Sequence, residues 1–156
     1  EPISTQKPED SSYIVDVNIK GVIYCLHYQI QEMLKYASPE NPCSIVNNSS
    51  ILSHAAYGGL TVYSSTKHAV TGLTKGAALE VAQSNIRVNA VGPGPIRTPM
   101  LEVPSDGHPE QFAGMVPMNR IGEPKEISDA VQWLLSDESG YVTGHTLMID
   151  GGFCSQ

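Results

Sequence analysis

A tyrosine and a lysine four positions apart, Tyr63 and Lys67, are the residues whose types and spacing best fit chemistry. Positions i and i+4 of a helix share a face, so the Tyr63 hydroxyl and the Lys67 ammonium are expected to reach one spot. A nearby cation favours the phenolate and lowers the pKa of tyrosine toward working pH. Tyr63 is therefore a candidate general acid/base for a carbonyl/alcohol pair. Ser50, which closes the preceding apolar run, is a candidate to hold the substrate oxygen beside Tyr63.

A Tyr-x-x-x-Lys pair taken alone is also typical of a solvated helix face. Its context favours the catalytic interpretation, because Ser49 and Ser50 end a predicted strand shortly before it. A serine hydrolase is not indicated, since no G-x-S-x-G elbow surrounds either serine. No metal site is expected either, because the five histidines lack ligand spacing with one another or with carboxylates. These are His27, His54, His68, His108 and His145.

Three segments position the candidate residues. Residues 44–48 are predicted to form a strand, and the continuous Ile45-Val46 pair is typical of a strand buried in a parallel sheet. A loop at 51–59 follows, in which His54 and Tyr57 are either pocket-lining or simply exposed. A helix is predicted over 60–83, with a small-residue stretch at Gly72, Gly76, Ala77 and Ala78.

The rest of the chain alternates between helix and strand patterns. Apolar residues at helical spacing predict a helix over 12–36, with Asp10 and Ser11 as candidate caps and a bend or close packing at Gly21. A strand is predicted at 86–91, broken by Gly92–Pro95, then an insert at 97–118 with one short helix near 109–115. A helix at 124–135 and a strand at 146–149 complete the pattern. This alternation predicts an α/β fold, a doubly wound parallel sheet in three α/β/α layers.

Several short motifs occur in a fixed order along nearly the whole chain, and together they resemble the short-chain dehydrogenase/reductase family in its short single-domain branch. They are Val17-Asn18-Ile-Lys-Gly21, Ile45-Val-Asn-Asn-Ser-Ser50, Tyr63-Ser-Ser-Thr-Lys67, Arg87-Val-Asn-Ala-Val-Gly-Pro-Gly94, Ile96-Arg-Thr98 and Ile149-Asp-Gly-Gly152.

The resemblance implies an oxidoreductase that moves hydride between a nicotinamide cofactor and a secondary alcohol or ketone. The implied catalytic residues are Ser50, Tyr63 and Lys67, with Asn18 supporting a water for proton relay. It also implies that Tyr63 and Lys67 contact the nicotinamide ribose. The residues implied to border the nicotinamide ring and its carboxamide are Pro93, Gly94, Ile96 and Thr98.

A glycine-rich turn between a strand and a helix, which would hold the pyrophosphate, is not found in this sequence. Thr71–Ala78 carries glycines but lies inside a predicted helix, and Gly92-x-Gly94 is followed by Arg97 where a third glycine would stand. The chain is thus expected to be a single domain, 1–156, that is incomplete at its N-terminal side and corresponds to the carboxyl-terminal portion of such an enzyme. The choice between NAD and NADP stays open.

Two other functions remain as alternatives. The missing turn favours a non-catalytic truncated homologue that acts as an oligomerisation or interaction module. An epimerase or dehydratase shares the Tyr-x-x-x-Lys pair, but such relatives carry a larger substrate domain, whereas little chain follows Gly152 here.

Composition bounds the partners. A formal net charge of −7 argues against a nucleic-acid or anionic-membrane partner, and no run is apolar enough for a membrane span. Three cysteines without C-x-x-C spacing and a start that lacks signal-peptide features predict a cytoplasmic protein with reduced thiols. The insert 97–118 is predicted to be a substrate lid, and the two-faced helices 12–36 and 60–83 predict a homodimer or homotetramer.

Overall fold

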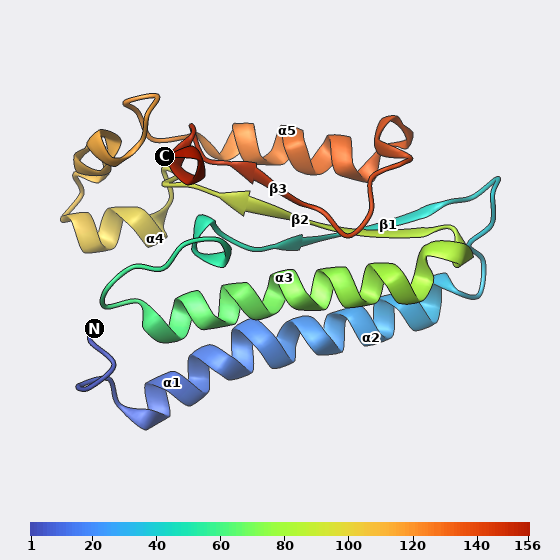
Figure 1. Ribbon diagram of the computed structural model, residues 1–156, viewed down its shortest axis with the longest axis horizontal. Helices are drawn as coiled ribbons and strands as arrows, with labels where there is room; N and C mark the ends of the chain where they lie inside the picture. The colour runs from blue at the N-terminus through green and yellow to red at the C-terminus, as the bar shows by residue number, and fades with distance from the viewer.

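A sheet of three parallel strands runs through the middle of the molecule (Figure 1). The computed structural model describes the backbone of all 156 residues and every side chain except that of Pro104. The strands are β1 (Cys43–Asn48), β2 (Ile86–Pro93) and β3 (Thr146–Ile149), in the order β1-β2-β3. Ile45 pairs with Val88 across the first ladder, and Val91 pairs with Leu147 across the second. The parallel sheet with flanking helices confirms the predicted fold class.

One long helical run at the N-terminus is divided into three parts. It comprises α1 (Pro8–Val15), a π-helical turn (Asp16–Lys20) and α2 (Gly21–Met33). The predicted caps Asp10 and Ser11 were wrong, because Pro8 starts the helix after Lys7, and proline suits the first turn, where its missing N–H is not needed. A methyl group on Gly21 would meet only ordinary contact, so the irregularity predicted there is the preceding π-turn and not close packing.

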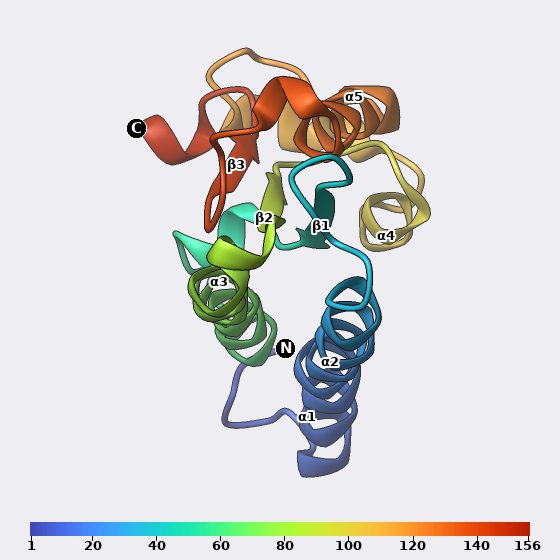
Figure 2. The same cartoon turned by 90° about the vertical axis from the view of Figure 1, so that its right-hand side faces the viewer.

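The helices lie on both faces of the sheet (Figure 2). The helix α3 (Thr61–Val81) packs mainly against β2, and α1 and α2 lie beside it on the same face. The helix α5 (Pro124–Leu135) covers the opposite face and contacts all three strands. These positions give the predicted three layers.

The hydrophobic core fills the space between the sheet and the α2–α3 layer. Its buried members come from the helices α2 and α3 and from the strands β1 and β2. They are Leu26, Ile45, Ala78, Val81, Ile86 and Val88. On the other face, Leu134 of α5 is fully buried against the sheet. The core therefore fixes α3 firmly under β2, and with it the residues that α3 carries.

Short helical turns occupy most of the connections. The 3₁₀ helices are Ile51–Ser53, Ala82–Ser84, Val103–Ser105, Pro109–Met115, Asp137–Ser139 and Phe153–Ser155, and α4 is Pro99–Glu102. The helix predicted near 109–115 is therefore present as a 3₁₀ helix, but the segment 97–118 also carries α4 and a further turn. β2 continues through Gly92 to Pro93, two residues beyond its predicted end at Val91.

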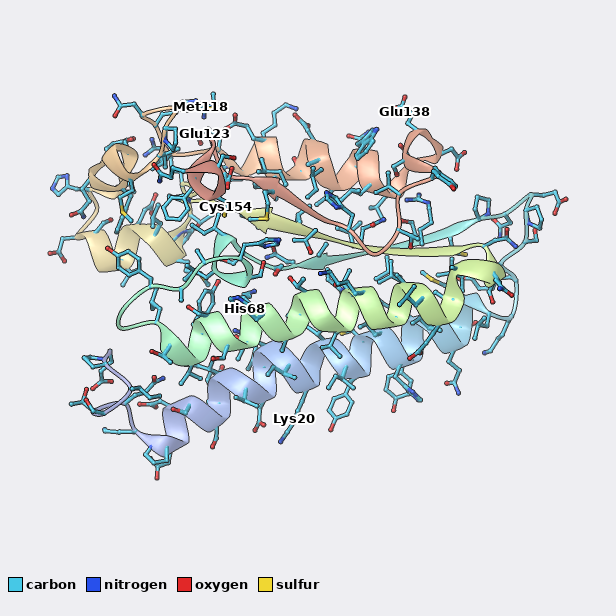
Figure 3. The ribbon with its side chains drawn as sticks, in the orientation of Figure 1. Lys20, His68, Met118, Glu123, Glu138 and Cys154 are labelled. Atoms are coloured by element: carbon cyan, nitrogen blue, oxygen red, sulfur yellow. The ribbon has the colours of Figure 1, made fainter. Side chains whose placement is uncertain are left out.

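The described part of the chain has no helix long and apolar enough to cross a membrane. Met118, Glu123 and Cys154 lie at the end of the molecule toward which the strands run, and Glu138 lies at the opposite end (Figure 3). Ligands of parallel sheets bind beyond the carboxyl ends of the strands, so this end is the place to look for a site.

Candidate active site

Ser50 lies just beyond β1, at the carboxyl end of the sheet. Ser49 still pairs with β2, because its N–H donates to the Val91 carbonyl at 2.8 Å. Ser50 is extended (φ −171°, ψ 163°) and caps the 3₁₀ helix Ile51–Ser53, accepting the Leu52 N–H on its Oγ at 3.1 Å. The Ser50 side chain is thereby held in a buried position, with its hydroxyl proton still available for donation.

Tyr63 and Lys67 project from the first turns of α3 toward the same region. Lys67 Nζ lies 5.5 Å from the centre of the Tyr63 ring and donates to the Asn48 carbonyl at 3.0 Å. This bond ties α3 to the last residue of β1. The i, i+4 spacing therefore places both side chains beside Ser50, as their sequence spacing suggests.

Burial dominates the electrostatics of this pair. It raises the pKa of Tyr63 above its usual value, and the Ser50 side chain opposes this by favouring the phenolate. Burial also lowers the pKa of Lys67. Desolvation of the phenol thus sets the direction of its pKa shift, and the expected lowering of the Tyr63 pKa by Lys67 stays a prediction.

Asn18 lies in the π-helical turn, across from α3. Its Nδ2 donates to Thr66 Oγ1 at 3.1 Å, and Thr66 Oγ1 in turn donates to the Tyr63 carbonyl at 2.7 Å. π-turns occur frequently at functional sites. Asn18 is therefore linked to the helix of the tyrosine through Thr66, a residue that the sequence reasoning missed, since nothing in the spacing of positions 18 and 66 signals a contact.

A cavity of about 730 Å³ brings the candidate residues together. Its walls include every residue that the sequence analysis proposed for catalysis or cofactor contact, namely Asn18, Ser50, Tyr63, Lys67, Pro93, Gly94, Ile96 and Thr98. The first half of α5 also lines it, through Pro124, Ile127, Ser128 and Val131, which the sequence did not point to. Their signal was weak because the apolar stripe of α5 looks like that of any sheet-covering helix.

Gly94 occupies a position that only glycine fits. A methyl group there would stand 2.8 Å from the Asp150 Cα, at the end of β3. The Gly94 N–H also donates to the Ile149 carbonyl at 3.0 Å. This close approach lets the segment Pro93–Pro95, which lines the cavity, pack tightly against the end of β3.

Ion pairs fasten the segment after β2 to the start of α5. Arg97 pairs with Glu110, and its Nε lies 3.0 Å from an oxygen of Glu123. Arg120 pairs with Glu126 at 2.6 Å, and hydrogen bonds from this guanidinium and from the Glu123 N–H hold the pKa of Glu126 down to about 2. Glu123 and Glu126 are thus both paired with arginines.

The two candidate residues of the loop after Ser50 differ in their placement. Tyr57 lines a smaller cavity that adjoins the first. His54 does not line either cavity; its Nδ1 lies 3.1 Å from Ser53 Oγ.

Comparison with known proteins identifies the family of this fold and site. A family described as "Enoyl-(Acyl carrier protein) reductase" matches residues 1–154. The 3-oxoacyl-(acyl-carrier-protein) reductase FabG of Thermotoga maritima is 41% identical over 146 residues, which are 94% of this chain and 58% of that protein. Cyclohexanol dehydrogenase of Acinetobacter sp. (strain SE19) is 36% identical over 143 residues, which are 92% of this chain and 54% of that protein.

Solved structures agree with these matches. ElxO with NADP bound superposes with a TM-score of 0.90 at 36% identity, over 99% of this chain and 62% of that one. The 3-ketoacyl-(acyl-carrier-protein) reductase of Brucella melitensis, complexed with NADH, gives a TM-score of 0.91 at 29% identity, over 99% of this chain and 62% of that one. The chain belongs to the short-chain dehydrogenase/reductase family and corresponds to a carboxyl-terminal portion of its members. It spans about 54–58% of the length of the two curated relatives named above.

Proposed function

We propose that this chain carries the catalytic portion of an NAD(P)-dependent oxidoreductase that interconverts a secondary alcohol and a ketone. The observation that supports this proposal most directly is that Ser50, Tyr63 and Lys67 line the same cavity of about 730 Å³. The walls come from the π-helical turn, the end of β1, the start of α3, the segment after β2 and α5. Family membership agrees with this assignment.

The side chains have distinct roles in the proposed reaction. The Ser50 hydroxyl accepts the Leu52 N–H, so its own proton is free to donate to the substrate oxygen. Tyr63, held neutral by burial, gives its proton to that oxygen in ketone reduction and accepts it back in alcohol oxidation. Lys67 donates one N–H to the Asn48 carbonyl, which leaves two N–H donors for hydroxyl groups of a ribose.

The cavity fits the nicotinamide end of a dinucleotide. Pro93 and Gly94 form part of its wall, with Gly94 packed closely against Asp150, and Ile96 and Thr98 continue the wall beside them. NAD or NADP supplies or takes up the hydride when bound, while the residues of this chain position the substrate and move the proton. Relatives whose structures contain NADP or NADH support the cofactor class without choosing between the two.

We also propose that the protein acts as a homodimer or homotetramer in the cytoplasm. A groove of about 500 Å³ between α2 and α3 is lined by Leu26, Ile30, Leu73 and Ala77 among others. Gly72 and Gly76 also line it, and a methyl group on either would meet nothing within 4 Å. The three cysteines are free, as is usual in a reducing compartment.

Titration of NADH fluorescence with the purified protein tests the proposed function. The proposal predicts saturable binding together with oxidation of NADH or NADPH when a ketone is added. Absence of binding and turnover in a folded protein would instead support a non-catalytic oligomerisation module. The Lys67→Met variant provides the control, because it removes a ribose contact and should weaken the binding of either dinucleotide.

A further inference from the structure

We infer that the substrate of the proposed enzyme is a free, uncharged ketone or alcohol with a hydrocarbon body. The inference rests on the proposed function, because it concerns the part of the substrate that extends away from the reacting carbon. It excludes carboxylates, phosphates and thioesters carried on acidic carriers. Two observations support it: the lining of a second cavity, and the pairing of the cationic side chains of the chain.

The second cavity, of about 200 Å³, begins where the first one ends. Ser50, Gly94, Pro95 and Leu101 line both cavities, so the two meet at the serine that would hold the substrate oxygen. A substrate whose oxygen is held by Ser50 can extend its body into this space, because Ser50 lines both cavities. The second cavity is therefore the place for the body of the substrate.

The side chains around this space are almost all apolar. They come from four parts of the chain: the 3₁₀ helix after Ser50, the residue before α3, the 97–118 segment and the C-terminal turn. They are Ile51, Leu52, Leu60, Phe112, Met115 and Phe153. Among the described lining residues, Ser50 and Tyr57 provide the only side-chain hydroxyl groups, and none of the lining residues is Asp, Glu, His, Lys or Arg.

This lining discriminates by charge. Moving a carboxylate from water into an apolar space without a cationic partner is strongly unfavourable, whereas the burial of a hydrocarbon group is favourable. No lysine, arginine or histidine lines the second cavity within the described part of the chain, so a charged substituent has no partner there. Size is limited as well, since the space suits a short alkyl chain or a single ring.

The pairing of the cations within the described chain also disfavours docking of an acidic carrier. Five of the nine Lys and Arg side chains are engaged in ion pairs with carboxylates of the same chain. Those five are Lys20, Lys35, Arg97, Arg120 and Lys125. Arg87 donates to the Leu134 and Ser136 carbonyls, and Lys67 lies in the first cavity.

Only Lys7, just before α1, and Lys75, on α3, then remain among the described Lys and Arg side chains, and they lie in different elements. With a formal net charge of −7, the chain repels acidic proteins and polyphosphates over most of its surface. This charge distribution favours a free small molecule as the substrate over one carried on an acidic protein.

A matched pair of ketones tests the inference directly. 2-Heptanone and 6-oxoheptanoate share the same skeleton, but the second has a carboxylate in place of the terminal methyl. Binding is followed by the ¹³C-methyl resonance of Met115, assigned with Met115→Leu, and turnover by oxidation of NADH and NADPH. Acetoacetyl-coenzyme A serves as the third probe, for a phosphate-bearing thioester. We expect 2-heptanone to shift the Met115 resonance and to bind at least about tenfold more tightly than 6-oxoheptanoate.

Two variants sharpen the comparison. Phe112→Arg places a guanidinium in the lining of the second cavity. It should reverse the preference by weakening the binding of 2-heptanone and strengthening the binding of 6-oxoheptanoate. Val103→Arg is the control, because Val103 lies in the same segment but is 78% exposed and lines neither cavity. It should leave the affinities for both ketones unchanged. If circular dichroism shows that Phe112→Arg does not fold, the affinities of the unaltered protein for the two ketones test the inference alone.

The outcomes separate this inference from the proposed function. Binding of 2-heptanone at Met115 without turnover would contradict the oxidoreductase proposal and leave the preferred ligand class intact. Turnover of 6-oxoheptanoate or acetoacetyl-coenzyme A as fast as 2-heptanone would overturn the inference while supporting the oxidoreductase. No response of the Met115 resonance to 2-heptanone would overturn it as well.

Discussion

The side-chain amide of Asn18 donates a hydrogen bond of 3.1 Å to the Thr66 hydroxyl, across the gap between the π-helical turn and α3. Thr66 passes the connection on by donating to the Tyr63 carbonyl at 2.7 Å. The π-turn therefore supports the helix that carries the proposed acid/base. Asn18 also lines the first cavity, so it stands at the place where the proton-relay water was expected.

Replacing Thr66 tests this link. Thr66 is 1% exposed, and Thr66→Val keeps its volume while removing the acceptor for Asn18. The free energy of unfolding should fall by about 1–3 kcal/mol, because a partly buried amide loses its partner. Urea denaturation measures the change. Thr66→Ser keeps the hydroxyl and loses only the methyl group, so it should be more stable than Thr66→Val. Equal stability of Thr66→Val and the unaltered protein would contradict the link.

Removing the Ser50 hydroxyl should shift the pH profile to higher pH. The Ser50 side chain lowers the pKa of Tyr63, so Ser50→Ala allows burial to raise that pKa further. Alcohol oxidation needs the phenolate and should begin at a higher pH than in the unaltered protein. Ketone reduction needs the phenol and should persist to a higher pH. Both profiles are measured on the residual activity.

Ser65→Ala is the matched control for the pH experiment. Ser65 is an exposed residue on α3 whose hydroxyl donates to the Thr61 carbonyl, so its removal should leave the profile in place. If the pH profile of Ser50→Ala is unchanged or moves to lower pH, Ser50 does not lower the pKa of Tyr63.

Assembly is tested at the groove between α2 and α3. The sequence predicts that this chain self-associates or is poorly soluble, and Tyr24 and Tyr28 of α2 are indeed 60% and 66% exposed. Gly72→Leu fills the groove, where a side chain meets nothing within 4 Å in the chain alone. Helix propensity should then stabilise the monomer by up to about 1 kcal/mol while the assembly weakens.

Light scattering distinguishes these outcomes. Leu79→Lys, on the same helix but outside the groove, should leave the assembly intact. A monodisperse monomer of the unaltered chain at micromolar concentration would show that this groove is not an interface.

The segment 97–118 is expected to act as a lid over the second cavity. It contributes Leu101, Phe112 and Met115 to that cavity, and Arg97 pairs with Glu110 inside the segment and with Glu123 beyond it. Backbone amides of this segment should exchange hydrogen more slowly when cofactor and ketone are both bound. Equal exchange with and without ligands would rule out a lid.

Most of the architecture followed from local pattern. Strands and helices were predicted within a few residues, because Ile45-Val46 and the periodic apolar positions of α3 and α5 record burial directly. The start of the first helix was missed, since Pro8 begins it four residues before the predicted start at Ser12. The π-turn was also missed, because it depends on packing against α3 and leaves no periodic signal.

The candidate site was predicted as a set of residues, and its electrostatics were not. The family's sequence motifs were enough to select Asn18, Ser50, Tyr63 and Lys67, and all four side chains line one cavity. The direction of the Tyr63 pKa depends on how deeply the phenol is buried, and burial is a property of the folded chain. Thr66 and the α5 wall likewise emerge only from tertiary contact.

The turnover of Tyr63→Phe tests the central claim most directly. The substitution removes one hydroxyl, so circular dichroism and the unfolding midpoint should change little. Tyr141→Phe, at a fully exposed position, controls for the loss of a phenol. The account predicts that NAD(P)H-dependent ketone reduction falls by at least about 10²–10⁴-fold in Tyr63→Phe and is unchanged in Tyr141→Phe. Near-normal turnover of a folded Tyr63→Phe protein would contradict the assignment of Tyr63 as the acid/base.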